Sequence, residues 1–136
     1  MEEWKTIIEA PNYEVSNLGR IRNKRLNRYV RTFINNSGYM QVVLRSNNKN
    51  LYRLVHRLVA IHFIDNPNSY CEVNHKDFDK TNNTVENLEW TSHKLNMKHN
   101  RLKSTCVESL TNRIIKECSK VIRENINKYV DSYAID

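Results

Sequence analysis

Histidine and asparagine side chains with the chemistry of a phosphodiesterase gather between residues 73 and 96. The chain reads V-N-H-K-D at 73–77, T-N-N at 81–83 and E-N-L-E-W at 86–90, and Asn96 follows. Hydrolysis of a phosphodiester needs a base to deprotonate water, and a divalent cation stabilises the charge on the phosphate and the leaving oxygen. A histidine can be the base, and amide oxygens are ligands that a hard cation accepts.

Two strands and a helix are predicted to carry these residues. Residues 72–76 and 88–91 have strand character, and residues 92–103 are predicted to be a helix with Thr91 or Ser92 as its N-cap. Asn74 and His75 are neighbours on a strand, so their side chains diverge. Strand twist or a bulge would let both reach a helix that packs across the hairpin, with Asn96 near its centre.

The segment before this stretch is expected to form a hairpin and a short helix. Residues 39–45 and 51–55 are predicted strands, joined by a long polar loop over 46–50. On the first strand Met40, Val42 and Leu44 share one face, and Tyr39, Gln41, Val43 and Arg45 share the other. Residues 55–64 have the apolar spacing of a buried helix, on which His56 and His62 are expected to pack.

A basic stretch lies near the N-terminus. Residues 1–70 hold 11 of the 22 lysines and arginines but only 5 of the 15 acids, and residues 20–31 read R-I-R-N-K-R-L-N-R-Y-V-R. Partial alternation predicts strands that bury one face and present bases on the other, as DNA binding requires. A solvated, charged sheet edge explains the pattern equally well. The candidate DNA-binding residues are Arg20, Arg22, Lys24, Arg25, Arg28, Arg31, Arg45 and Arg53.

Composition excludes several other classes of protein. The 136 residues contain no apolar run of about eighteen, and the N-terminus M-E-E-W-K lacks the features of a signal peptide. We therefore expect an intracellular protein, neither secreted nor in a membrane. The three cysteines are an odd number without a C-x-x-C pair, which argues against a disulfide scaffold and a cysteine-ligated zinc site.

The last segment, residues 104–136, is predicted to be an amphipathic helix. Its apolar positions follow one helical stripe: 107, 110, 114, 118, 121, 122, 126, 129 and 130. The stripe must pack on the chain itself or form a homodimer interface, and the poor heptad regularity favours the former.

Taken together, the motifs resemble those of HNH endonucleases, and most closely the phage and intron-encoded homing subgroup. The resemblance covers roughly residues 2–100. It rests on H-R-L-V-A at 56–60, V-N-H-K-D at 73–77, K-T-N-N at 80–83, N-L-E-W at 87–90 and Asn96. The N-terminal E-W-K at 3–5 and Y-E-V-S-N-L-G-R-I-R at 13–22 resemble an element that such nucleases often carry and that is thought to contribute to DNA binding.

The resemblance implies a role for each matching residue. His75 matches the general base, Asn87 an asparagine that braces the loop and orients the histidine, and Asn96 a metal ligand. Asn74 stands where many members have an aspartate ligand, which lowers the expected negative charge. Asp77 is expected to brace the loop, and Asn82 and Asn83 to make turn hydrogen bonds. Phe78 replaces a common glycine, so the loop is expected to differ in shape there.

The sequence thus predicts an α+β protein that hydrolyses DNA with a divalent cation. The resemblance implies that the ion is Mg²⁺ or Mn²⁺ and that the products have a 5′-phosphate and a 3′-hydroxyl. The predicted parts are a basic β module (1–54), a ββα-metal nuclease core with its preceding helix (55–103) and the C-terminal helix. The alternative is a DNA-binding regulator that keeps this fold but has weak or no cleavage. An RNA binder has only the basic charge in its favour. The expected location is the cytoplasm of a bacterial or virus-infected cell.

Overall fold

The computed structural model describes residues 1–103, 110–111, 114–115, 118 and 120. The helix predicted over 104–136, with its possible dimer interface, lies outside these residues except at the isolated positions just given, which are helical. The chain divides into two compact units, Met1–Asn96 and Met97–Asp136. The predicted catalytic and metal-binding residues all lie in the first unit.

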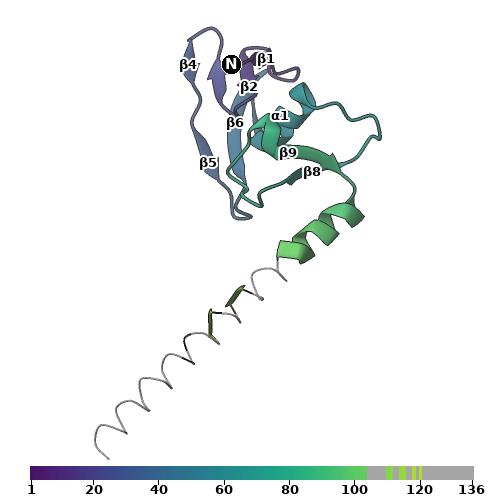
Figure 1. Ribbon diagram of the computed structural model, residues 1–136. Coiled ribbons are helices and arrows are strands. Elements are labelled where there is room, and N and C mark those ends of the chain that lie inside the picture. The colour runs from purple at the N-terminus through teal and green to yellow at the C-terminus, as the bar shows by residue number, and fades with distance from the viewer. Residues whose placement is uncertain (104–109, 112–113, 116–117, 119, 121–136) are drawn as a thin grey trace, which may run out of the picture. The chain divides into compact units, whose positions relative to one another are not determined.

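The first half of this unit is built from two antiparallel sheets (Figure 1). One sheet has the order β1-β2-β3-β4 and contains Trp4–Thr6, Tyr13–Ser16, Ile21–Asn23 and Arg28–Tyr29. The other has the order β5-β6-β7 and contains Thr32–Ile34, Met40–Ser46 and Lys49–Leu54. Val15 and Ile21 pair across β2 and β3, and both are fully buried.

The basic stretch follows its predicted alternation only at its start. Ile21 is buried on β3, but Leu26 and Tyr29 are exposed. Residues 24–27 form a turn, and β4 is a two-residue strand at the edge of its sheet. Alternating burial requires a continuous strand, so the alternation predicted for residues 20–31 holds only on β3.

The β6–β7 hairpin has the predicted faces but a different connection. Val42 and Leu44, which share one predicted face, are both fully buried. The predicted long loop over 46–50 is wrong, because Ser46 pairs with Lys49 and only Asn47 and Asn48 connect the strands. Both asparagines have positive φ values, 49° and 60°, as a type I′ turn requires.

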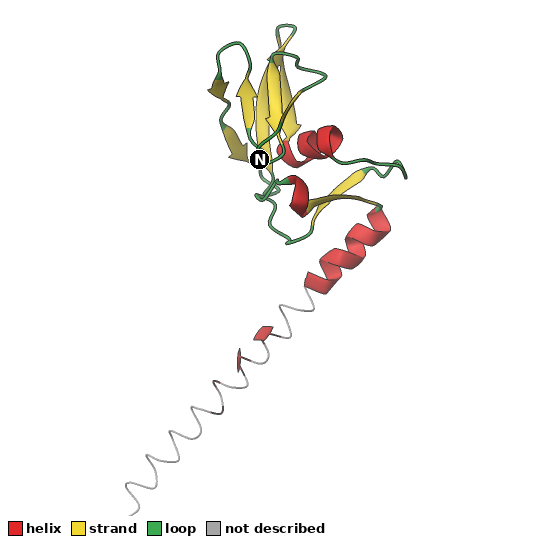
Figure 2. Cartoon of the chain, turned by 45° about the horizontal axis from the view of Figure 1, so that its top comes forward, coloured by secondary structure: helices red, strands yellow, loops and turns green. Residues whose placement is uncertain are grey.

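Helix α1 (Val55–Phe63) is the central element of this unit, as Figure 2 shows. It contacts β2 of the first sheet and β6 of the second. It also contacts a third sheet, which consists of the two strands β8 (Glu72–His75) and β9 (Leu88–Thr91). A short 3₁₀ helix, η1 (Val85–Asn87), leads into β9. The chain is helical again from residue 93, where the Ser92 hydroxyl accepts a hydrogen bond from the Leu95 N–H at 3.4 Å.

One hydrophobic core connects these elements. It contains Val15 and Ile21 from the first sheet, Leu44 from the second, Val59 from α1 and Leu88 from β9. The N-terminal sheets and the β8–β9 hairpin therefore stabilise each other. None of the helices in the described part of the chain combines the length and hydrophobicity that a membrane span requires.

Candidate active site

His75, the predicted base, is the last residue of β8, and its imidazole is almost fully buried. Its Nε2 atom lies 3.0 Å from Oδ1 of Asn83. The Asn83 amide is held in this orientation because its Nδ2 group donates to the Thr81 carbonyl oxygen at 3.1 Å. An amide oxygen only accepts hydrogen bonds, so a neutral His75 carries its proton on Nε2 and its lone pair on Nδ1. This tautomer can accept a proton from water.

Two further rings pack around His75. The His56 ring meets it edge-on with the centroids 5.0 Å apart, and the Tyr39 ring lies 6.0 Å away. Burial, followed by the positive charges of His75 and Arg57, lowers the pKa of His56 to about 3. Its Nδ1 atom is buried and has no hydrogen-bond partner among the described residues. His56 is therefore uncharged at neutral pH and contributes packing to the site.

Asn87 organises the loop that follows β8. Its Nδ2 group donates to Oδ1 of Asp77 and to the carbonyl oxygen of Asn82, both at 2.8 Å, and its Oδ1 accepts from the Asp77 N–H at 3.1 Å. Asn82 Nδ2 donates to the same carboxylate at 2.7 Å. Hydrogen bonds, that from Asn82 above all, hold the pKa of Asp77 below its usual range. The loop is therefore closed by a charged acceptor surrounded by amide donors.

The two predicted metal ligands, Asn74 and Asn96, are each paired with a glutamate. Asn74 Nδ2 donates to Oε1 of Glu89 at 2.9 Å, directly across the β8–β9 pair. Asn96 Nδ2 donates to Oε2 of Glu72 at 2.6 Å. This hydrogen bond and one from His93 hold the pKa of Glu72 below its usual range. Glu72 and Asn74 are two residues apart on β8 and so share one face of the strand.

The chemistry of this face fits a hard divalent cation. Glu89 and Glu72 accept hydrogen bonds from the amide nitrogens of Asn74 and Asn96. The Oδ1 atoms of these two asparagines accept no hydrogen bond within the described part of the chain. The carboxylates of Glu72 and Glu89 supply negative charge that the amides lack. No three His, Cys, Asp or Glu side chains gather at one point among residues 1–103 and the other described positions. A cation here would therefore depend on amide oxygens.

The eight bases predicted to bind DNA fall into two groups. Four form ion pairs with nearby carboxylates: Arg20 with Glu2, Arg22 and Lys24 with Glu14, and Arg53 with Glu9. The Arg22 guanidinium also lies 4.2 Å above the Trp4 ring. The other four are exposed and form no ion pair in the part of the chain that the structure describes: Arg25, Arg28, Arg31 and Arg45. These four have the charge most available to a phosphate.

Two residues of the site do more than their sequence pattern predicts. Asn83 was expected to make turn hydrogen bonds, and it also contacts His75. Glu89 was not singled out, yet it holds Asn74. The role of Glu89 could have been found from the two predicted strands. If His75 pairs with Leu88 next to the connecting loop, Glu89 lies opposite Asn74. No comparable pattern in the sequence points from Asn83 to His75.

Comparison with known proteins finds relatives of one kind. Residues 2–45 match the NUMOD4 motif. The chain is 41% identical over 133 residues to an uncharacterized HNH endonuclease of Acanthamoeba polyphaga mimivirus, covering 96% of this chain and 37% of that protein. It is 34% identical over 115 residues to DNA endonuclease I-HmuI of Bacillus phage SP01, covering 84% of this chain and 66% of that protein.

A solved structure is also similar. That structure concerns DNA binding and cleavage by the HNH homing endonuclease I-HmuI. It matches this chain with a TM-score of 0.70 and a sequence identity of 35%. The match covers 76% of this chain and 60% of the solved chain. The chain therefore spans between 37% and 66% of the length of these relatives.

Proposed function

Because this chain belongs to the family of HNH homing-type endonucleases, we propose that it cleaves DNA by metal-dependent hydrolysis of a phosphodiester bond. The observation that carries the proposal is the buried hydrogen bond between His75 and Asn83, next to a loop closed by Asn87. A packing histidine has no need of a fixed tautomer, whereas a general base does. The HNH relatives supply the reaction class, and the site supplies a residue for it.

His75 acts as the base in this proposal. Asn83 keeps the proton on Nε2, so Nδ1 accepts a proton from the attacking water. Asn87 acts indirectly, since it holds the loop that carries Asn82 and Asn83 against β8. The His56 ring packs on the imidazole and, being neutral, does not repel the positive charge that His75 gains when it takes the proton.

The oxygen atoms of Asn74 and Asn96 are the proposed ligands for one Mg²⁺ or Mn²⁺ ion, with Glu72 and Glu89 as nearby negative charges. When bound, the cation would neutralise charge on the scissile phosphate and on the leaving oxygen. In this proposal β8, β9 and the helix that starts at residue 93 form the ββα-metal element of the nuclease. Residues 1–54 form its DNA-binding module.

DNA is held by the exposed arginines that form no ion pair with another described residue. Arg25 lies in the turn after β3, Arg28 on the edge strand β4, Arg31 just before β5 and Arg45 on β6. An arginine without a carboxylate partner gives its full charge to a phosphate and loses no existing ion pair on binding.

A cleavage assay on supercoiled plasmid tests the proposal. The purified chain is incubated with plasmid in Mg²⁺, in Mn²⁺, and in each metal with excess chelator, and nicked and linear products are separated on a gel. We expect cleavage with metal and none with chelator. Binding to the plasmid without cleavage in either metal would contradict the enzymatic proposal, and cleavage that survives the chelator would contradict the metal.

A further inference from the structure

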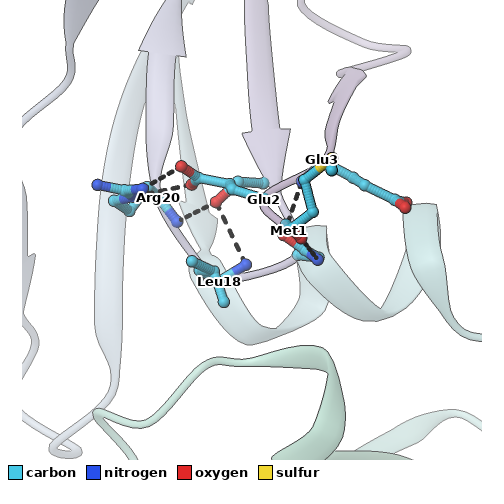
Figure 3. Close-up of polar contacts among 7 residues, drawn as sticks. Met1, Glu2, Glu3, Leu18 and Arg20 are labelled. Carbon is cyan, nitrogen blue, oxygen red and sulfur yellow. Dashed lines mark hydrogen bonds and ion pairs between the residues drawn. The ribbon is translucent and has the colours of Figure 1, made fainter.

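The loop between β2 and β3, residues 16–20, is held tightly within the N-terminal sheet. The Ser16 hydroxyl accepts hydrogen bonds from the backbone N–H groups of Leu18 at 3.3 Å and Arg20 at 3.1 Å. The Arg20 guanidinium forms a two-point ion pair with Glu2, as Figure 3 shows. Both ends of the loop are thereby attached to the body of the sheet.

Asn17 attaches the same loop to the start of the chain. Its Oδ1 accepts from the Glu3 N–H at 2.9 Å, its Nδ2 donates to the Met1 carbonyl oxygen at 3.2 Å, and its own N–H donates to the Glu3 carbonyl oxygen at 3.1 Å. Figure 3 shows these N-terminal residues next to the loop. With so many of its polar groups engaged, the loop has little freedom to shift.

The opposite side of this loop lies against the segment that carries Asn83. The Asn17 carbonyl oxygen accepts a hydrogen bond from the Val85 N–H at 2.9 Å. Gly19 lies so close that a Cβ atom there would be 2.9 Å from both the Cβ and the carbonyl oxygen of Asn83. Real Cβ atoms essentially never approach other atoms so closely. Only glycine allows this approach, and its φ of +79° is also one that other residues rarely adopt.

We propose that Gly19 is a positioning residue for the catalytic histidine, acting through Asn83. The proposal rests on the proposed function of His75 as general base. Gly19 lets the loop seat the Asn83 backbone, Thr81 orients the Asn83 amide, and the amide oxygen holds the Nε2 proton of His75. The N-terminal motif thus supports the reacting imidazole as well as supplying DNA-binding residues.

Two glycine-to-alanine variants separate this role from simple backbone strain. Gly19→Ala and Gly38→Ala both place an alanine at a φ near +80°, so the backbone penalty is similar. A Cβ at Gly38 meets only the Lys80 side chain at 3.6 Å, an ordinary contact. For Gly19→Ala we expect the single-turnover cleavage rate at saturating DNA to fall roughly 10- to 100-fold, because small displacements of catalytic groups cost that much. Gly38→Ala should stay within about threefold of the unmodified chain.

The affinity for DNA provides a second measurement. Gly19→Ala leaves every arginine in place, so the Kd for a DNA duplex in Ca²⁺ should change less than about threefold. Equal cleavage rates for Gly19→Ala and Gly38→Ala would overturn the proposal. A rate loss that disappears at saturating DNA would overturn it as well, since Gly19 would then act on binding.

The tautomer of His75 can be read without any cleavage. In long-range ¹H–¹⁵N spectra of the metal-free protein, at a pH where the imidazole is neutral, we expect the Nε2–H form for the unmodified chain and for Gly38→Ala. Gly19→Ala and Asn83→Ala should both lose this preference. A dominant Nδ1–H form in the unmodified chain would overturn the proposal.

A double-mutant cycle tests whether Gly19 acts through Asn83. If it does, Gly19→Ala should lower the rate less than about twofold when added to Asn83→Ala. Multiplying effects would overturn the pathway. If Gly19→Ala does not fold, Asn83→Ala tests the same pathway. Gly19 is proposed to act through Asn83, so cleavage by Asn83→Ala at the unmodified rate would overturn the proposal. His75→Ala runs alongside. If it cleaves normally, the proposed function fails; if it is inactive while Gly19→Ala cleaves at the unmodified rate, only the positioning role fails.

Discussion

At the scale of single residues, this site depends on what an amide can do that a carboxylate cannot. Each asparagine amide donates and accepts at once, so one end can be fixed while the other is directed. Asn83 is fixed by Thr81 and directs its oxygen to His75, and Asn74 is fixed by Glu89. A carboxylate in either position would lose the donor that sets its orientation.

Replacing the histidine tests the base directly. His75→Ala should reduce the cleavage rate by roughly 10² to 10⁴, the usual contribution of a general base, while DNA affinity stays the same. His62→Ala is the matched control, since His62 lies on α1 and its Nδ1 contacts the Leu58 carbonyl at 2.7 Å. Timed plasmid digests measure both. The role of His75 would be ruled out by two digests that proceed at the same speed.

The Asn74–Glu89 pair predicts how the proposed cation site responds to added charge. In Asn74→Asp, two carboxylates face each other across β8 and β9, so they repel until a cation binds. We expect a lower melting temperature without metal and a larger increase on adding Mg²⁺ than in the unmodified chain. Thermal unfolding with and without Mg²⁺ measures this, and Asn68→Asp, at an exposed loop position, is the control. An equal Mg²⁺ response in all three proteins would argue against Asn74 as a ligand.

His56 predicts a pH dependence of stability. Its pKa is about 3 in the folded protein and near 6.5 in an unfolded chain. Between these values the unfolded chain binds a proton that the folded chain does not, so the free energy of unfolding falls as the pH falls. The loss is at most about 1.4 kcal/mol per pH unit, and it vanishes above pH ~6.5. His56→Gln should flatten the slope in urea unfolding between pH 6.5 and 4, whereas parallel curves would show that His56 titrates normally.

The candidate residues of the site and their partners within one hairpin could be predicted from the sequence, but partners from distant segments could not. Strand pairing is local, so the register that sets Asn74 opposite Glu89 follows from two short ranges. The approach of Gly19 to Asn83 joins segments 64 positions apart and depends on how two sheets pack on α1. Phe78 is a residue whose backbone conformation its type does not predict. Its φ of 65° lies in the region that glycine adopts freely, so the hydrogen bonds around Asp77 maintain this turn despite the side chain.

At the scale of elements, the β6–β7 turn offers a simple stability test. Asn48 has a φ of 60°, at the second position of a two-residue turn. Asn48→Gly should raise the free energy of unfolding by about 0.5 to 1 kcal/mol, because glycine has no steric cost there. Asn50→Gly, two residues further on and within β7, should lower it by a similar amount. Urea unfolding compares them, and a loss of stability in Asn48→Gly would show that the turn depends on the asparagine side chain.

Elements with a clear hydrophobic period were predicted well, and those defined by turns were not. Helix α1 and strand β9 begin and end within about one residue of their predicted limits, since buried residues at regular spacing define them. The predicted loop over 46–50 was too long, and the turn at 24–27 was predicted to be strand. Asparagines and arginines there carry no apolar period, and only the left-handed backbone at Asn27, Asn47 and Asn48 marks the turns.

At the scale of the whole molecule, the net charge is +7, and the candidate DNA-binding bases divide into those paired with a carboxylate and those that form no ion pair among the described residues. Replacing Arg25, Arg28 and Arg31 with glutamine should weaken DNA binding for all sequences. The slope of log affinity against log salt should fall by about 0.9 for each phosphate that is no longer neutralised. Arg53→Gln is the control, because Arg53 is paired with Glu9 and should add little to the slope. A salt titration of Kd decides, and an unchanged slope in the triple variant would place the DNA elsewhere.

The close contact of Gly19 with Asn83 has a consequence for chimeras made from two related chains. A chimera with its junction at residue 54 or 55 joins the N-terminal motif of one chain to the remaining residues of another. Two surfaces from different proteins must then pack against each other. The contact that has to fit in such a chimera is the packing of residues 16–20 against residues 81–85. Both segments are far in sequence from the junction. Chimeras should therefore reach the full cleavage rate only where the incoming motif keeps a glycine at position 19 and the recipient keeps a residue at position 83 that fits against it.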